Sequence, residues 1–588
     1  MSFSDRLHLI LLRGRPLRVA PWLVAACLAA ACLPAPAARA GMVAAGPSAG
    51  VDADFIAGGF ALSQGNPGVA AGYFSHALAR RPGDSVLLRR AFDAALMSGS
   101  PVALRLAARL PRNDAAVLLL AGADARTGNW AAAEQRIATL PHDGQAGLLR
   151  PVLLAWAEQG AGHTDQALAT LAPLVAEPHA PGFYLLHAGM IADLGGRSAE
   201  AAKLFQRADS ALGPGDLRTT LILASFDLRH GNRAMALRRL DSLTRDSPEF
   251  SIALPALTEG LSHPPVATAA GGMAEAFLGL GATLQAAARP ESALLMLRLA
   301  LAVRPDFAAA RLLAAELLGD QHKSRHALAL LAGIAVNDPL APVASLQAAD
   351  LLRAMGHTNA ALQRLAQLER VFPHSPLPFG EAGDILRDTH HPHAAIAAYT
   401  HALANAAPLT ARDWVLLYNR GIAYDDAHDW AHADADLHAA LRLVPDQPLV
   451  LNYLGYSWAD RGVHLPEAQR MIEAAAKSDP DSAAITDSLG WVLFRRHDIA
   501  RAVQTEQRAA ELAPEDPTIN DHLGDVYWAA GRRLEARYQW ERALTLQPAP
   551  AEAASLRARL RQDQSAAVVG APAASAKAGP AAAATKLR

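Results

Sequence analysis

Leu489-Gly490-Trp491 is the stretch that decides the fold, because Leu454-Gly455-Tyr456 precedes it and Leu523-Gly524-Asp525 follows it at nearly equal spacing. The three glycines are 35 and then 34 residues apart. An alanine and later a proline follow each Leu-Gly, namely Ala468, Ala502 and Ala536, then Pro480, Pro514 and Pro548. A period of this length in a chain rich in alanine and leucine indicates a repeated pair of helices.

The same spacing continues toward the N-terminus. The alanine that opens the second helix of each unit recurs at positions 70, 103, 133, 167, 201, 236, 293, 327, 361, 395, 433, 468, 502 and 536. With its Leu-Gly, aromatic, alanine and proline positions, this pattern resembles the tetratricopeptide repeat. The resemblance covers nearly everything from Asp54 to Pro548 and implies an all-α, right-handed α-solenoid of about fourteen helix-turn-helix repeats.

The small residues of the repeat have a packing reason. A glycine inside a helix costs up to about 1 kcal/mol relative to alanine, so its recurrence at 421, 455, 490 and 524 indicates a close approach of two helices. Large side chains are expected to face the preceding helix as knobs, and these are Phe74, Phe205, Leu297, Tyr399, Ile472 and Trp540. Because one helix pair cannot bury its own apolar face, neighbouring units must stack.

The domain organisation follows from where the period starts, breaks and stops. One step, from Ala236 to Ala293, spans 57 residues and contains several prolines and a Gly-Gly pair. This break is interpreted either as one degenerate helix plus a loop or as a hinge between two arrays. The expected segments are a signal peptide at 1–40, a linker at 41–53, an N-terminal array at 54–248, an irregular insertion or hinge at 249–273, a C-terminal array at 274–548, a capping helix at 549–564 and a disordered Ala/Pro-rich tail at 565–588.

The N-terminal residues predict export from the cytoplasm. Four arginines between residues 6 and 18 precede an apolar run at 19–33, and Ala38-Arg39-Ala40 fits a small-x-small cleavage site. Both cysteines, Cys27 and Cys32, lie in this segment, so the mature chain would carry no thiol, which suits the periplasm. The alternative is a membrane-anchored lipoprotein that keeps an acylated cysteine, Cys32, as its first residue.

Composition and motifs exclude several classes of function. The formal net charge is −2 and the pI is near 6.9, so the chain has no global field that would attract nucleic acid. After the signal, no run is long and apolar enough for a transmembrane segment. The chain lacks an H-E-x-x-H motif, a phosphate loop and a dinucleotide fingerprint, so we expect no enzyme, no catalytic residue and no cofactor.

A partner-binding groove is predicted in the C-terminal repeats. In this repeat family the first helix of each pair lines the concave surface, and side chains spaced i, i+4, i+7 share one face. Six of nine Trp and seven of nine Tyr lie between residues 399 and 540, which favours this half as the binding surface. The predicted groove residues are Tyr418, Asp425, Asn452, Tyr456, Asp487, Trp491, Arg495, Asp521, Asp525 and Trp528.

The groove chemistry leads to three functional hypotheses. An acidic and aromatic groove suits a polar or basic segment, so the first is a cell-envelope scaffold that binds a peptide or protein partner there. The second is a component of an exopolysaccharide export or outer-membrane assembly complex, which rests on resemblance alone. The third is a metal-binding protein or enzyme that uses the His/Asp cluster at 425–436, where His428 and His432 are spaced i, i+4 among aspartates.

Overall fold

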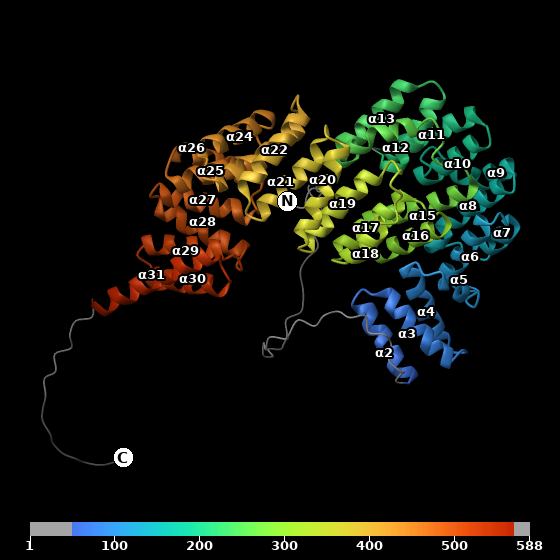
Figure 1. Ribbon diagram of the computed structural model, residues 1–588, viewed down its shortest axis with the longest axis horizontal. Coiled ribbons are helices and arrows are strands. Elements are labelled where there is room, and N and C mark those ends of the chain that lie inside the picture. Colours follow the sequence, from blue (N-terminus) through green and yellow to red (C-terminus); the bar gives the residue numbers. More distant parts are fainter. Residues whose placement is uncertain (1–49, 214, 570–588) are drawn as a thin grey trace, which may run out of the picture. The chain divides into compact units, whose positions relative to one another are not determined.

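The structure is a computed structural model that describes residues 50–213 and 215–569. These residues form thirty α-helices, α2–α31, with two short 3-10 helices and no strand among them (Figure 1). The expected signal peptide at 1–40, most of the linker and the last part of the expected tail lie outside the described residues. The expectation of an all-α solenoid is confirmed for the part of the chain that the structure describes.

The described residues divide into two compact units after Ile385, within α21 (Pro376–Asp388). The first unit contains α2 (Val51–Ser63), α3 (Pro67–Arg80), α4 (Ser85–Ser98), α5 (Val102–Ala107), α6 (Asp114–Arg126), α7 (Trp130–Ala138), α8 (Gly144–Gly160), α9 (Thr164–Val175), α10 (Gly182–Leu194), α11 (Ser198–Leu212), α12 (Leu217–Arg229), α13 (Arg233–Asp246), η1 (Pro248–Ala253), α14 (Leu254–Gly260), α15 (Ala269–Ala286), α16 (Pro290–Val303), α17 (Ala308–Asp320), α18 (Ser324–Leu331), α19 (Ala341–Ala354) and α20 (Thr358–Val371).

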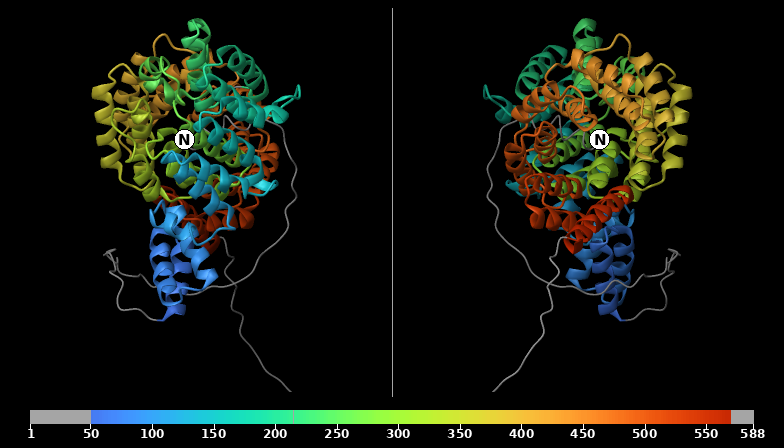
Figure 2. Two further views of the ribbon diagram at one scale, coloured as in Figure 1. Left: turned by 90° about the vertical axis from the view of Figure 1, so that its right-hand side faces the viewer. Right: turned by 90° about the vertical axis from the view of Figure 1, so that its left-hand side faces the viewer.

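The second unit continues the same succession of helix pairs. It contains α22 (Pro392–Ala406), η2 (Ala411–Asp413), α23 (Trp414–Asp426), α24 (Trp430–Leu443), α25 (Pro448–Arg461), α26 (Leu465–Ser478), α27 (Ala483–Arg495), α28 (Ile499–Leu512), α29 (Pro517–Ala529), α30 (Arg533–Thr545) and α31 (Pro550–Val569). In Figures 1 and 2 these helices run from orange to red and follow one another as stacked pairs.

The repeat register read from the sequence is confirmed by burial. All fourteen of the predicted second-helix alanines lie in second helices and are at most 3% exposed. The predicted knobs are buried too, and several face the glycine of the preceding helix. A Cβ atom on Gly58 would lie 2.7 Å from the Phe74 ring, and one on Gly455 would lie 2.7 Å from Ile472. Glycine is therefore required where the two helices of a pair cross.

The turn between the helices of many pairs places one residue in the left-handed conformation. Glycine occupies this position at Gly128 (φ 77°) and Gly531 (φ 78°), for example. Histidine occupies it at His428 (φ 60°) and His497 (φ 64°), and also at 322, 390 and 464. Left-handed backbone costs a side-chain-bearing residue roughly 1–2 kcal/mol, so these histidines stand where glycine would be favoured.

The first helices of the first unit are covered by later helices of the same unit. Helix α15 packs against α8, and α16 packs against α4 and α6. A Cβ atom on Gly272 of α15 would collide with the Trp156 ring of α8, and one on Gly122 of α6 would lie 2.6 Å from Val303 of α16. The N-terminal array thus closes on α15 and α16 with side chains in direct contact.

The segment at 249–273 contains most of η1, the short helix α14, a loop and the start of α15. Its side chains Ile252, Leu257 and Leu261 are buried, and η1 packs against α13 and α19. The Ser225 hydroxyl donates to the backbone carbonyl of His263 at 2.8 Å. The segment therefore lies inside the first unit, and the division between compact units falls in α21 because α15 and α16 pack back onto the N-terminal helices.

Helix α31 is the last helix of the second unit. Leu556 is fully buried, and Arg559 pairs with aspartates of α29. The helix reaches Val569, five residues past the predicted end, so residues 565–569 of the expected tail are helical. No helix in the described residues combines the length and the apolar character that a membrane span requires.

Candidate functional site

The ten predicted groove residues lie on α23, α25, α27 and α29, the first helices of four consecutive pairs. Local signals position these helices: the Ser482 hydroxyl accepts from the Ile485 amide at the start of α27, and the Asp516 carboxylate accepts from the Thr518 amide at the start of α29. Asp487 is buried, and the other nine predicted residues are partly buried. We call this set of ten residues the inner wall.

At the α23 end of the inner wall, an aspartate and two tyrosines form a connected group. The Tyr453 hydroxyl donates to Asp425 at 2.7 Å, and the Tyr418 and Tyr453 rings meet edge to face at 5.8 Å. Burial raises the pKa of Asp425, an effect that the hydrogen bond from Tyr453 opposes. Sequence reasoning predicted Tyr418 and Asp425 but missed Tyr453, which follows Asn452 directly.

At the α29 end, two aspartates bind the capping helix. Arg559 of α31 donates to Asp521 at 2.7 Å and also pairs with Asp525, which accepts from Trp540 Nε1 at 3.0 Å. Burial raises the pKa of Asp525, and Arg559 opposes the rise. The Asp525 carboxylate therefore holds α29, α30 and α31 together, in addition to any role toward a ligand.

Trp528 belongs to the packing between α29 and α30. Its ring centroid lies 5.4 Å from that of Trp540, and the Arg533 guanidinium lies 4.1 Å from its ring centroid. Both neighbours come from α30, so one face of this predicted anchor is occupied within its own repeat.

In the middle of the inner wall, Trp491 stacks on His522. The two ring centroids are 4.2 Å apart and the planes differ by 21°. Tyr456 of α25 approaches the same imidazole at 6.3 Å, and Arg495 lies 5.9 Å from the Trp491 ring centroid. Arg495 also donates to the backbone carbonyl of Asp460 at 2.5 Å, which ties α27 to the end of α25. His522 therefore links the first helices of three consecutive repeats.

Several polar atoms of the inner wall are buried without a hydrogen-bond partner. They are Asp425 Oδ1, Asn452 Oδ1, Asp521 Oδ1 and Trp491 Nε1. Three of the four are acceptors, so this part of the wall has more oxygen acceptors than donors. A buried polar atom without a partner costs about 1–3 kcal/mol, which makes such atoms candidates for contact with a ligand.

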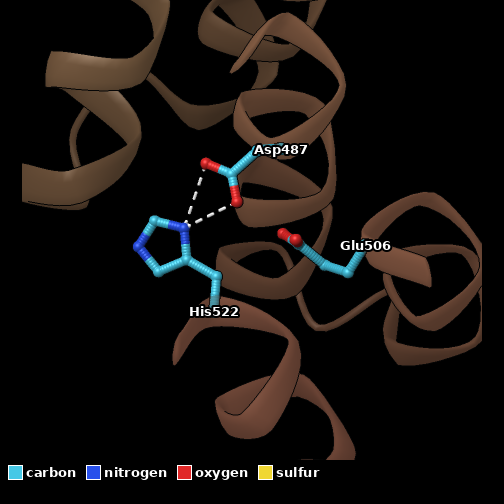
Figure 3. Close-up of side chains that lie close together, drawn as sticks. All are labelled: Asp487, Glu506 and His522. Carbon is cyan, nitrogen blue, oxygen red and sulfur yellow. Dashed lines mark hydrogen bonds and ion pairs between the residues drawn. The ribbon is translucent and has the colours of Figure 1, made fainter. Parts of the chain in front are cut away.

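Asp487 of the inner wall belongs to a buried group whose other two members, Glu506 and His522, were missed by sequence reasoning. His522 Nδ1 lies 2.9 and 3.1 Å from the two carboxylate oxygens of Asp487, and Glu506 of α28 points toward this pair (Figure 3). Glu506 is fully buried, and neither of its carboxylate oxygens has a partner. The signal was available, because residue 506 follows Ala502 by four positions, as the knob Ile472 follows Ala468.

The pKa values of Glu506 and His522 are both raised in this buried group. Burial raises the pKa of Glu506 well above its ordinary value, and the neighbouring Asp487 carboxylate adds to the rise. Burial by itself lowers the pKa of His522, but the Asp487 carboxylate outweighs burial and the pKa is raised. A protonated Glu506 carboxyl group could donate a hydrogen bond to Asp487. An ionised Glu506 has no hydrogen to donate, so both of its oxygens stay without a partner.

The His/Asp cluster at 425–436 is not brought together as a metal site. Asp434 accepts from Trp458 and Arg461, while Asp436 binds Arg420 at 2.7 Å. His432 stacks on Tyr424, and His428 serves the left-handed turn. Among the described residues, the three side chains that place metal-ligand atoms within 4.8 Å of one another are Asp487, Glu506 and His522.

Comparison with known proteins agrees with the helix-pair geometry. The family model described as Tetratricopeptide repeat matches residues 464–517, which contain the whole of α26, α27 and α28. Residues 464–517 belong to the tetratricopeptide repeat family. Tetratricopeptide repeats generally mediate protein–protein interactions, and proteins built from them are typically non-enzymatic scaffolds.

The chain is similar to individual proteins over different lengths. A TPR repeat-containing protein of Pseudomonas aeruginosa is 36% identical over 113 residues, which is 19% of this chain and 19% of that protein. Among solved structures, the APC/C hetero-tetramer Cut9–Hcn1 has a TM-score of 0.37 at 15% identity and covers 87% of this chain and 96% of its own. Yeast Tom70 has a TM-score of 0.33 at 12% identity and covers 78% and 96%.

Proposed function

We propose that the second unit is a protein-binding module whose inner wall holds a basic segment of a partner protein. The observation that supports this most directly is the surplus of oxygen acceptors on the inner wall, because Asp425 of α23, Asn452 of α25 and Asp521 of α29 each keep an unpartnered oxygen. Lys and Arg side chains carry only donors, and hydrogen bonds to charged groups are about twice as strong as neutral ones. A donor-rich ligand therefore complements this wall better than an acidic one.

The first unit has its first helices covered, which supports assigning the partner to the second unit. Its helices α4, α6 and α8 are covered by α15 and α16, with Trp156 and Val303 among the side chains that fill the space between them. Side chains already packed against each other offer a partner little surface. We therefore assign the partner to the second unit and a mainly structural role to the helices of the first.

Peptides of opposite charge test this proposal. Fluorescently labelled Lys/Arg-rich and Asp/Glu-rich peptides of equal length are titrated with the purified chain, and anisotropy is read at two salt concentrations. We expect the basic peptide to bind more tightly and its affinity to fall with salt. Equal affinity for both peptides would show that the inner wall does not select a basic segment.

A single variant locates the contact on the inner wall. Asp425→Asn keeps an acceptor for the Tyr453 hydroxyl but removes the negative charge, so the local packing is retained. We expect about tenfold weaker binding of the basic peptide, which corresponds to ~1.4 kcal/mol. The control is Asp481→Asn, because Asp481 is an exposed aspartate on the turn before α27. If the two variants bind alike, the inner wall is not the site.

We propose further that the mature chain is exported and works in the cell envelope. The arginines before the apolar run and the cleavage site at Ala38-Arg39-Ala40 support this proposal. Fractionation with N-terminal sequencing tests it: Gly41 as the first residue in the periplasmic fraction is expected, and an acylated Cys32 would establish the lipoprotein alternative. Recovery in the cytoplasm with the signal intact would overturn it. Co-purification with exopolysaccharide export or outer-membrane assembly proteins would favour the more specific hypothesis.

A further inference from the structure

Glu506 occupies a position where the other repeats of the second unit carry an apolar or aromatic knob. Gly455 faces Ile472, Gly421 faces Leu437 and Gly524 faces Trp540, whereas Gly490 faces the carboxyl group of Glu506. The Glu506 side chain is fully buried and both of its oxygens lack a partner. An ionised carboxylate in this environment is strongly unfavourable unless a cation or a proton neutralises it.

Two further ligand-type side chains meet Glu506 from the helices on either side. Asp487 comes from α27 and His522 from α29, and all three side chains are buried. One ligand atom from each lies within 4.8 Å of the other two, and Figure 3 shows the Glu506 carboxyl group directed at the Asp487–His522 pair. Because Glu506 and His522 lie 19 and 35 positions after Asp487 in the chain, only the stacking of two repeats brings the three side chains together.

The charges around this group favour a cation. Asp521 and Asp525 lie on α29 together with His522, and the two aspartates share one cation, Arg559 of α31. Four carboxyl groups thus stand against two cationic groups, namely Asp487, Glu506, Asp521 and Asp525 against His522 and Arg559. When the imidazole becomes neutral to serve as a ligand, the group carries three excess negative charges, and one bound divalent cation would reduce this excess to one.

We propose that Asp487, Glu506 and His522 bind one divalent transition-metal ion, with Zn²⁺ as the ion that fits the donors best. Carboxylate oxygen and imidazole nitrogen are both zinc ligands, and Glu506 offers two free oxygens, so the three side chains can supply four donor atoms. Binding displaces the proton on His522 Nδ1 to solvent. Ca²⁺ and Mg²⁺ need six or more oxygens or several waters, which this closed site does not offer.

The ion would fasten three consecutive helices beneath the Trp491–His522 stack of the inner wall. The inference does not rest on the proposed peptide binding, since each of the three ligands is buried. It differs from the sequence hypothesis of a metal at 425–436, because it uses other residues and helices.

The test uses the purified full chain, stripped with a chelator, dialysed at neutral pH and then loaded with Zn²⁺ or Co²⁺. We expect one tightly held zinc per chain by elemental analysis, a zinc-dependent rise in the unfolding temperature and a visible Co²⁺ absorption band. Glu506→Leu and Glu506→Gln should each abolish the Co²⁺ band and weaken zinc binding by at least tenfold. Leucine suits this register, since Leu437 fills it in the repeat two pairs earlier.

A matched variant separates the buried site from adventitious zinc on the surface. His432→Ala removes the exposed imidazole that pairs with Asp429 and should leave zinc content, unfolding temperature and the Co²⁺ band unchanged. The proposal is overturned if the chain retains no zinc, if the Glu506 variants hold as much zinc as the unsubstituted chain, or if His432→Ala alone removes it. In the first of these cases, a proton neutralises Glu506.

Discussion

Two adjacent glycines of α2 are expected to respond in opposite ways to the same substitution. A Cβ atom on Gly58 would lie 2.7, 2.8 and 2.9 Å from three atoms of the Phe74 ring, whereas a Cβ atom on Gly59 would have no neighbour within 4 Å. Phe74 is 1% exposed and packs 5.9 Å from the Phe55 ring, so its own ring has little room to move.

The magnitudes follow from two opposing effects. Alanine in place of glycine inside a helix stabilises by about 1 kcal/mol. Gly59→Ala should therefore stabilise the α2–α3 pair by about that amount. Gly58→Ala gains the same helix propensity, but overpacking costs about 1–3 kcal/mol, because a carbon–carbon contact prefers about 3.5–4.0 Å. The net effect of Gly58→Ala is a loss of up to about 2 kcal/mol.

Hydrogen exchange measured by mass spectrometry on peptides from α2 and α3 reports this difference locally. We expect protection to rise about fivefold in Gly59→Ala and to fall in Gly58→Ala. The double variant Gly58→Ala with Phe74→Leu should recover part of the loss, since the smaller side chain removes the collision. Equal shifts in the same direction for both single variants would refute the argument that residue 58 is a crossing point.

Three further predictions concern protonation and turn geometry. Burial lowers the pKa of His187 to about 3, and Trp156 donates to its Nδ1 at 3.0 Å, so the histidine is neutral in the folded chain. The unfolded chain protonates His187 below about pH 6.5, so the free energy of unfolding should fall from pH 6.5 toward pH 3 by at most ~1.4 kcal/mol per pH unit. Urea unfolding at a series of pH values measures this slope. The same slope in His187→Gln would contradict the assignment to His187. Burial raises the pKa of Glu316 to about 7, so the folded chain loses stability as the pH rises from about 4.5 to 7. Glu316→Gln should therefore raise the unfolding midpoint at pH 8 but not at pH 4.5. An equal change at both pH values would contradict the assignment to Glu316. His497 has φ 64°, so His497→Gly should stabilise by roughly 0.5–1 kcal/mol in urea unfolding, and a loss of stability would mean that its ring makes contacts worth more than the backbone strain.

Much of the architecture could be predicted because the repeat is local. The alanines and glycines lie where the two helices of one pair cross, and these two helices are only about 20 residues apart in the chain. Small side chains at a crossing indicate that the two helices approach closely. This is why all fourteen alanine positions are buried and why Phe74 and Ile472 face glycines. The division of the chain could not be predicted, because it depends on α15 and α16 packing against helices more than 100 residues earlier.

The candidate site was predicted only in part. The i, i+4, i+7 spacing identified Asp425, Asp487 and Trp491, since helical periodicity is visible in the sequence. It did not identify Tyr453 or His522 as their partners. Those side chains belong to neighbouring helices, and their contacts depend on how far one repeat is rotated against the next.

What the sequence determined by itself is the unit: a pair of helices of about 34 residues, with small residues where the helices cross and prolines where a unit ends. The tertiary structure decided which side chains from different units meet. Glu506 has the register of a knob in the sequence, and it becomes part of a buried polar group only when α27 and α29 bring Asp487 and His522 beside it. The physical reason is that helix periodicity depends on the spacing of residues close together in the chain. The burial and the electrostatic environment of a site depend on every helix that packs around it.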